Sequence, residues 1–456
     1  MRSSPHWRLA LAWIAGFTLI DSSIVTLALP DIARDFNRPV GELAWVPTAY
    51  LLALAASLLA AGRLSDRLGA RLVLTGGAIG FLITTAACGL APTFELLVAA
   101  RVVQGIFGGV LYTVSLAITT TVFEPERRAT AIAIYFTSGA LGALLGPVIG
   151  GVLTDLGGWR TVFLAQLPLP TIVAVMAWVI LPAGRGMQRR FDLPGVALAS
   201  LFVVALVFTM LQVPAVGLGL PVVLGGVVTV LALVAFILRE RATDAPAVQL
   251  AIFRNARFVS ATLAGAGAWF AIMAYTIYTA IYLELGRGIE ATQAGVLLLA
   301  GPLVALALFP FMGRIVGQLG VDRAQLLGLG VLVGAALMRA TWNGSTGVPL
   351  IVVTNLITGL GLSITLVASA TDALSQFAPS EAGTGSALFN SLRQIGAALG
   401  VALPAVAFEL IATGSREPAA VLAGSTAAFI LQVAVLAIPF TLILSRWRPQ
   451  QAPALT

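Results

Sequence analysis

Asp21 is an acidic residue inside a stretch that is otherwise long and apolar enough to cross a membrane. A carboxylate at such a depth costs about 3 kcal/mol or more unless it is protonated, paired or open to water. Such a group can take up and release a proton or another cation. The alternative is a carboxylate that is fixed in a structural hydrogen-bond network.

Arg101 is a second charge within an apolar stretch, in the segment Arg101-Val102-Val103-Gln104-Gly105. An arginine does not deprotonate in proteins and therefore needs water or partners. We expect Arg101 to hold Asp21 ionised, or to couple proton release from Asp21 to a change of conformation. The alternative is a structural tie between Arg101 and backbone carbonyls, with Gln104 contributing packing or contact with a small molecule.

Several further residues are candidates for contact with a bound small molecule. Aromatic side chains at helical spacing more often pack or anchor at the membrane interface, which is the alternative for most of them. Glu284 lies beside three tyrosines and is the acid expected to meet a cationic compound, while Glu95, Asp372 and Glu409 are expected to be solvated. The candidates are Trp13, Tyr50, Gln104, Tyr112, Phe136, Trp269, Tyr275, Tyr278 and Glu284.

A charged segment, residues 62–71, lies between two long apolar runs and holds three arginines and an aspartate. We expect a short loop here, with glycines for a tight turn, and a cytoplasmic location because clustered arginines resist translocation. A weaker copy occupies residues 313–320. The candidate gating residues in this segment are Gly62, Asp66, Arg67 and Arg71.

A glycine stripe, made of Gly142, Gly146 and Gly150 with Pro147, lies in a later apolar run. Glycines four residues apart let a neighbouring helix approach closely, and an internal proline bends a helix. Close packing alone or a rocking contact would explain the stripe. Gly396 and Gly400 repeat part of the stripe in the second half, where Arg393 is expected near the cytoplasmic side as a gate contact or a snorkelling side chain.

Composition identifies an all-helical, polytopic membrane protein, since 59% of the residues are hydrophobic and 10% are charged. The net charge of +7 includes no lysine, and the arginines between spans explain it by membrane topology rather than by nucleic-acid binding. One cysteine, Cys88, and one histidine, His6, offer no disulfide and no metal cluster. We find no nucleotide-binding or catalytic motif and expect no enzyme activity, no cofactor and no metal.

Apolar runs of about twenty residues predict fourteen spans, with both termini on the cytoplasmic side. This topology places eighteen arginines on the cytoplasmic side and six outside, Arg339 among the latter. We expect a six-helix bundle at 1–182, two linker helices and a surface elbow at 183–256, and a second six-helix bundle at 257–456. The predicted spans are 8–29, 42–62, 72–90, 94–120, 129–153, 161–182, 194–214, 217–238, 257–284, 291–312, 322–341, 347–371, 382–411 and 420–445.

These motifs together resemble the major facilitator superfamily, and specifically its fourteen-helix drug:proton antiporter branch. The segment 62–71 is similar to the cytoplasmic loop signature of that superfamily, 101–105 to its arginine motif, 142–151 to its antiporter motif, and 21–30 to the first-helix signature of the branch. The chain departs from the branch at Thr26 and Gln166, where asparagine is usual. The resemblance also implies that Asp66 meets the start of a helix in the other bundle, for which 383–386 is suitable.

From the motifs and the resemblance we expect proton-coupled efflux of small amphipathic organic compounds by alternating access, in the cell (inner) membrane. Asp21 and Arg101 would couple protons to transport, and a monomer would suffice. One alternative is an importer or facilitator of a metabolite with the same fold. Another is a membrane sensor that binds a ligand without moving it.

Overall fold

The structure is a computed structural model, and it describes residues 20–446 except 26–27, 39, 44, 184–191, 218, 244–245, 247, 414 and 416. All regular elements in the described ranges are helices, because long apolar runs satisfy their backbone hydrogen bonds internally in this form. In chain order they are α2 (Asp21–Ile24), α3 (Leu29–Phe36), α4 (Val40–Leu43), α5 (Trp45–Leu68), α6 (Ala70–Gly89), α7 (Phe94–Thr121), α8 (Pro125–Gly157), α9 (Trp159–Leu164), α10 (Pro168–Ile180), α11 (Leu193–Val216), α12 (Leu220–Ala242), η3 (Leu250–Arg254), α13 (Ala256–Ile281), η4 (Tyr282–Gly286), α14 (Ala291–Leu298), α15 (Ala300–Leu319), α16 (Val321–Ala340), α17 (Val348–Ser375), η5 (Pro379–Glu381), α18 (Ala382–Ala412) and α19 (Pro418–Arg446).

The helices confirm the predicted all-helical membrane fold. Thirteen helical stretches of the described residues are long and apolar enough to cross a membrane, and most of the one remaining predicted span, 8–29, lies outside the described residues. Four spans combine consecutive helical elements: α9 with α10, α13 with η4, α14 with α15, and η5 with α18. The break between α9 and α10 lies next to Pro168, and the break between α14 and α15 lies at Leu299.

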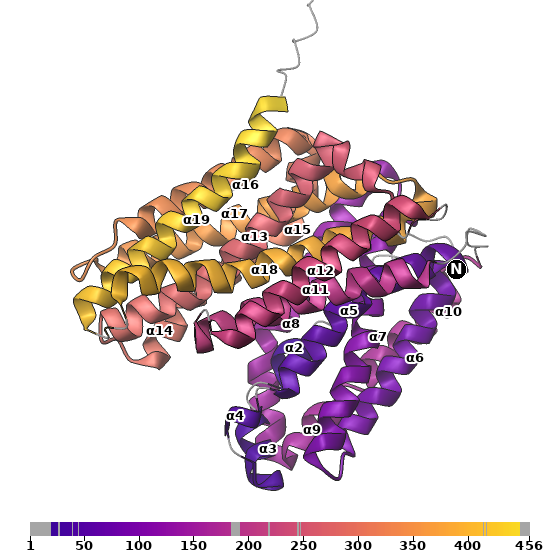
Figure 1. The fold of residues 1–456 in the computed structure, drawn as a ribbon, viewed down its shortest axis with the longest axis horizontal. Coiled ribbons are helices and arrows are strands. Elements are labelled where there is room, and N and C mark those ends of the chain that lie inside the picture. Colours follow the sequence, from indigo (N-terminus) through magenta and orange to yellow (C-terminus); the bar gives the residue numbers. More distant parts are fainter. Residues whose placement is uncertain are drawn as a thin grey trace, which may run out of the picture.

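The chain forms two helical bundles, as Figure 1 shows, with the N-terminal half in indigo to magenta and the C-terminal half in orange to yellow. Helices α11 and α12 follow the first bundle, and α11 lies alongside both bundles. On the first bundle, Ser200 Oγ of α11 donates a hydrogen bond to the carbonyl oxygen of Ala56. On the second, Val203 and Val207 of α11 share an apolar cluster with Ala398 of α18. Helix α11 therefore contacts both bundles, while Val222 of α12 shares an apolar cluster with Ala402 of α18.

The segment that the sequence predicts as a loop is mostly helical, which corrects that prediction. Helix α5 continues to Leu68, and the turn is made at Gly69, whose φ of 89° suits glycine. Gly320 makes the corresponding turn in the second half, with a φ of 77°. The Gly69 and Gly320 turns define the end of the molecule that we call the arginine-rich end.

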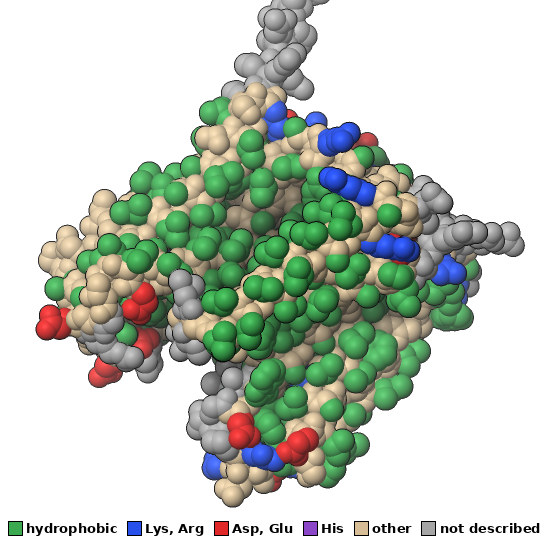
Figure 2. Space-filling view, viewed as in Figure 1, with side chains coloured by type: hydrophobic (Ala, Val, Ile, Leu, Met, Phe, Trp, Pro, Cys, Tyr) green, Lys and Arg blue, Asp and Glu red, His purple; other side chains and the backbone are tan. Residues whose placement is uncertain are grey.

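Charged side chains gather at the ends of the molecule, and an apolar belt separates them in Figure 2. Much of the basic surface lies at one end and much of the acidic surface at the other. Arg257 belongs to the arginine-rich end, because it pairs with Asp322, two residues after Gly320. The exposed belt carries side chains such as Leu231 at 63% and Ile83 at 62% exposure. Such exposure is expected for helices that face lipid rather than water.

Candidate functional site

Asp21 and Arg101 form a fully buried ion pair between α2 and α7. The Arg101 Nη1 atom donates a hydrogen bond to Asp21 Oδ2 at 2.7 Å, and both side chains are 0% exposed. Neither charge could remain ionised alone in such surroundings without a large desolvation cost. The structure therefore places Asp21 in a paired network rather than open to water.

Gln104 extends this pair into a network that reaches α6. Its Nε2 donates to Asp21 Oδ1 at 3.1 Å and to Thr85 Oγ1 at 2.8 Å. Its Oε1 accepts from Arg101 Nη1 at 2.7 Å and lies 3.4 Å from Cys88 Sγ. The Gln104 amide on α7 thus links the Asp21 carboxylate on α2 to Thr85 on α6. The sequence did not indicate Thr85 as a partner.

Helix α5 completes the surroundings of Arg101. The Nε of Arg101 donates a hydrogen bond to the carbonyl oxygen of Val46 in α5 at 3.1 Å. The predicted tie to a backbone carbonyl is therefore present alongside the pair with Asp21. The Tyr50 ring lies 4.3 Å from the guanidinium carbon, within cation–π range. A side chain at Gly105 would lie 2.3 Å from the Tyr50 carbonyl oxygen, so this glycine lets α5 and α7 approach closely.

The glycine stripe of α8 packs against the helix that carries Asp21. A Cβ atom at Gly142 would lie 3.1 Å from the Ile20 backbone nitrogen, and one at Gly150 would lie 2.1 Å from the Ile24 carbonyl oxygen. These two contacts lie on either side of Asp21 in sequence. The stripe therefore positions the acid through close helix packing, while the Pro147 side chain lies outside what the structure describes.

Asp66 joins the bundles at the arginine-rich end through the contact that the sequence predicts. Its carboxylate accepts hydrogen bonds from the backbone nitrogens of Gly383 and Thr384, each at 2.8 Å, and from Thr384 Oγ1 at 2.6 Å. The free amides and the dipole at the start of α18 favour a negative charge there. Gly62 packs against Gly383 so tightly that a Cβ atom would lie 2.3 Å from the Gly383 carbonyl oxygen.

The other arginines of this segment have separate roles in the packing. The Arg71 guanidinium carbon lies 4.1 Å from the centroid of the Trp178 ring, and Arg67 is exposed. Neither takes part in the Asp66 contact.

Arg393 lies at the interface between the bundles, where it is only 2% exposed. Its Nη2 donates to the Tyr112 hydroxyl of α7 at 2.9 Å, and its Nη1 donates to Asn390 Oδ1 at 3.0 Å. Ser386 Oγ donates to the Thr113 carbonyl oxygen nearby, at 2.8 Å. The structure thus places Arg393 in a contact between bundles rather than in a snorkelling position.

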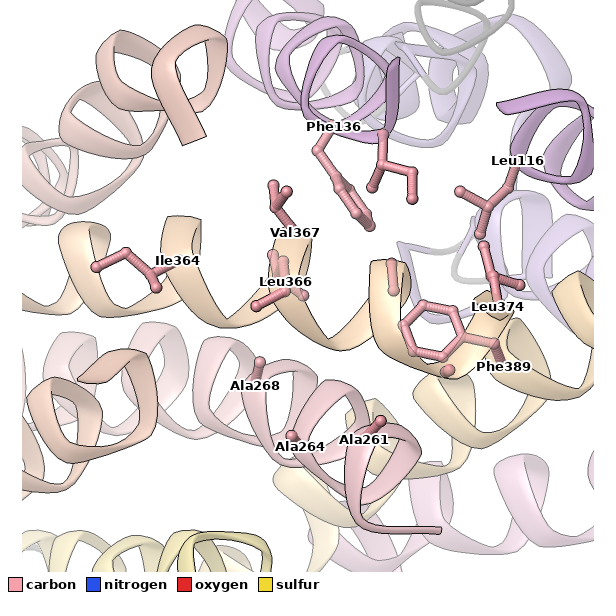
Figure 3. Close-up of a cluster of buried hydrophobic side chains, with 14 of the residues drawn as sticks. Leu116, Phe136, Ala261, Ala264, Ala268, Ile364, Leu366, Val367, Leu374 and Phe389 are labelled. Atoms are coloured by element: carbon pink, nitrogen blue, oxygen red, sulfur yellow. The ribbon is translucent and has the colours of Figure 1, made fainter. Parts of the chain in front are cut away.

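Apolar packing supports the same interface. The Phe136 and Phe309 rings stack with centroids 6.0 Å apart, which joins α8 to α15. Figure 3 shows Phe136 and Leu116, from the first bundle, pointing toward Val367, Leu374 and Phe389 of the second. The hydrogen bonds and the packing lie in the parts of the helices nearer the arginine-rich end.

The remaining candidates do not converge on Asp21. The Tyr275 hydroxyl donates to the Leu298 carbonyl oxygen at 2.7 Å, and the Tyr278 hydroxyl donates to that of Val401 at 3.2 Å. Both bonds tie helices together within the second bundle. Glu284 is exposed in η4, and Trp13 lies outside the described residues.

Arg339 is fully buried, which corrects its predicted place outside the membrane. It donates to Gln432 Oε1 at 3.1 Å and to Thr358 Oγ1, and its guanidinium carbon lies 4.9 Å from the Tyr275 ring centroid. Its position near a helix end predicts contact with water, but packing against α17 and α19 buries the side chain. The repeat offered a signal, because the offset that aligns Gly62 with Gly313 also aligns Cys88 with Arg339.

Two bundles with a buried charge network between their helices define a membrane transporter rather than an enzyme. The chain belongs to the Major Facilitator Superfamily, whose family model matches residues 11–401. It is 32% identical to the tetracenomycin C resistance and export protein of Streptomyces glaucescens, over 88% of this chain and 76% of that protein.

Two further similarities agree with this membership. The multidrug resistance protein Stp of Mycobacterium tuberculosis is 29% identical, over 84% of this chain and 72% of that protein. Among solved structures, the proton:xylose symporter XylE superimposes with a TM-score of 0.66 at 13% identity, over 95% of each chain. The XylE similarity supports the fold alone. The names of the other two relatives are those of a resistance and export protein and of a multidrug resistance protein.

Proposed function

We propose that this chain is a proton-coupled exporter of small amphipathic organic compounds in the cytoplasmic membrane, with its arginine-rich end and both termini facing the cytoplasm. The export and resistance functions named for its relatives support the direction of transport. The concentration of arginines at one end supports the orientation. The described architecture, two bundles joined at one end, supports alternating access.

The Asp21–Arg101 pair is the observation that carries this proposal. Protonation of Asp21 would remove the negative charge 2.7 Å from the guanidinium and leave Arg101 as an uncompensated buried cation. The four helical segments that the network joins would then favour another arrangement. Proton binding and helix packing are therefore linked through one carboxylate, because each changes the free energy of the other.

The cycle follows from this linkage. With the arginine-rich end closed by Asp66 and Arg393, a proton from outside would add to Asp21, and the bundles would rock to open the cytoplasmic side. Loss of that proton to the cytoplasm would restore the ion pair, and an organic compound would bind in its place. Return to the outward-facing arrangement would release the compound outside. One proton would enter the cell for each transport cycle in which Asp21 binds and releases a proton.

Proton release on substrate binding tests this proposal. Hydrophobic drugs added to the purified, detergent-solubilised chain should displace protons into a weakly buffered solution. Asp21→Asn should bind the same compounds without releasing protons, while Glu95→Gln, which changes an exposed acid, should behave like the wild type. Binding to the wild type with no proton release would favour a facilitator or a sensor instead.

A further inference from the structure

We propose that Arg393 recognises the acidic or carbonyl oxygens of planar aromatic compounds, so that the substrates are aromatic acids or quinone-like molecules rather than cations. This inference rests on the proposed transport function and names its substrate class. It begins from the charge of the side chain. Arg393 is 2% exposed and bonds only to the neutral oxygens of Tyr112 and Asn390, and none of the described acids forms an ion pair with it.

The acids near other parts of the interior already have partners. Asp21 is paired with Arg101, and Asp66 accepts hydrogen bonds from the start of α18. Asp372, which we expected to be solvated, is instead 1% exposed and is paired with Arg257 and Arg446 at the arginine-rich end. The charge of Arg393 at the bundle interface is therefore not balanced by these carboxylates, and a buried cation of this kind favours an anionic partner.

The polar atoms around Arg393 provide a second and independent observation. Arg393 Nε, Trp269 Nε1 and Asn390 Nδ2 are buried and have no acceptor among the described residues. All three are hydrogen-bond donors, and buried donors without acceptors are costly. A ligand that satisfies them must bring acceptor oxygens, which a carboxylate, phenolate or quinone carbonyl does and an ammonium group does not.

Aromatic rings from both bundles surround the same guanidinium. Its central carbon lies 4.8 Å from the Trp269 ring centroid, 5.0 Å from that of Phe136, 5.5 Å from Phe389 and 5.6 Å from Tyr112. Flat faces of this kind stack on planar ligands, because offset and edge-to-face arrangements of aromatic rings are favourable. The ligand class therefore combines a planar ring system with an oxygen acceptor at its edge.

The bundle motion of the proposed cycle would give a ligand access to this site. The Tyr112 hydroxyl comes from the first bundle, and Arg393 and Trp269 belong to the second. When the bundles part at the arginine-rich end, Tyr112 moves away and the guanidinium loses one of its two acceptors. The exposed donors would then meet a compound that enters from the cytoplasm.

Three anthracene probes that differ only in one substituent test the inference. The full chain, purified in detergent at neutral pH without a proton gradient, is equilibrated with anthracene-9-carboxylate, anthracene-9-methanol and 9-(aminomethyl)anthracene, and binding is measured by equilibrium dialysis. The wild type should bind the carboxylate at least about tenfold more tightly than the alcohol, and the ammonium compound most weakly. Arg393→Gln should abolish this preference, while Arg34→Gln, at an exposed arginine, should keep it.

A second variant keeps the inference testable if Arg393→Gln fails to fold. Trp269→Phe replaces the indole by a smaller aromatic ring and removes the N–H donor, so it should weaken carboxylate binding by about threefold with little change for the alcohol. Equal affinity of the wild type for the three probes, or an unchanged preference in the folded variants, would overturn the inference. Asp21→Asn should keep the preference for the carboxylate probe. Failure of the proton-coupling proposal and failure of the substrate-class inference would therefore be seen in different measurements.

Discussion

The Arg101 guanidinium donates a hydrogen bond to Asp21 at 2.7 Å, and no part of either side chain is exposed. The pair joins two charged groups of opposite sign in surroundings that exclude water. Its members come from α2 and from α7, so their separation depends on how these helices pack. The pair is therefore a structural tie between these two helices.

A double-mutant cycle should reveal the strength of this tie. Arg101→Gln leaves Asp21 as an unpaired buried carboxylate and should lower the free energy of unfolding by roughly 3–5 kcal/mol. Adding Asp21→Asn removes that charge, so the double variant should regain part of the loss. Thermal unfolding in detergent measures both changes. Simple additivity of the two single effects would contradict a direct coupling.

Arg339 provides a matched comparison, because it is equally buried but pairs with none of the described acids. Arg339→Gln removes a buried charge and leaves only two neutral side chains, Gln432 and Thr358, without their hydrogen-bond donor. An unsatisfied neutral group of this kind lowers the free energy of unfolding by about 1–3 kcal/mol. We therefore expect Arg339→Gln to cost less than Arg101→Gln in the same thermal measurement. A larger loss for Arg339→Gln would show that its charge has a partner we have not assigned.

Asp66→Asn should shift the conformational equilibrium toward an opening at the arginine-rich end. The substitution keeps the shape of the side chain but removes the charge that faces the start of α18, which should cost the closed state about 1 kcal/mol or more. Spin labels at Leu68 and Ser380, introduced after Cys88→Ser, would report the distance between bundles. Unchanged distance distributions and unchanged transport would contradict this role for Asp66.

Gly150→Ala should disrupt the packing of the first membrane helix. The new methyl group would lie 2.1 Å from the Ile24 carbonyl oxygen, a distance that requires the backbone to move. We expect a loss of thermal stability of roughly 1–3 kcal/mol. Gly226→Ala is the control, because a methyl group at Gly226 meets nothing within 4 Å and alanine favours the helix. Equal effects of the two substitutions would argue against close packing at Gly150.

Much of the fold could be predicted from the sequence, because membrane thickness sets the length of an apolar helix. The predicted spans 94–120 and 382–411 correspond to α7 and α18 with shifts of a residue or less at each end. The partners of Asp21 and Asp66 could also be predicted from the sequence, because a buried carboxylate requires a cation or a set of hydrogen-bond donors.

Other features depend on tertiary contacts that hydropathy does not encode. Residues 62–68 look like a loop because they are charged, but they form the last turns of α5, where Gly62 packs closely against Gly383. Arg339 looks solvated because it is near a helix end, yet neighbouring helices cover it. Asn390 and Arg393 lie three residues apart on α18, but Trp269 belongs to α13 and Tyr112 to α7, so local spacing does not reveal the whole set.

Uphill export from inverted membrane vesicles tests the central claim most directly. An imposed proton gradient should drive an organic substrate into vesicles that contain the wild type or Glu95→Gln, and collapse of the gradient should stop the movement. Asp21→Asn should insert normally and show no gradient-driven accumulation. Undiminished accumulation by Asp21→Asn would contradict the assignment of Asp21 as the proton-coupling residue.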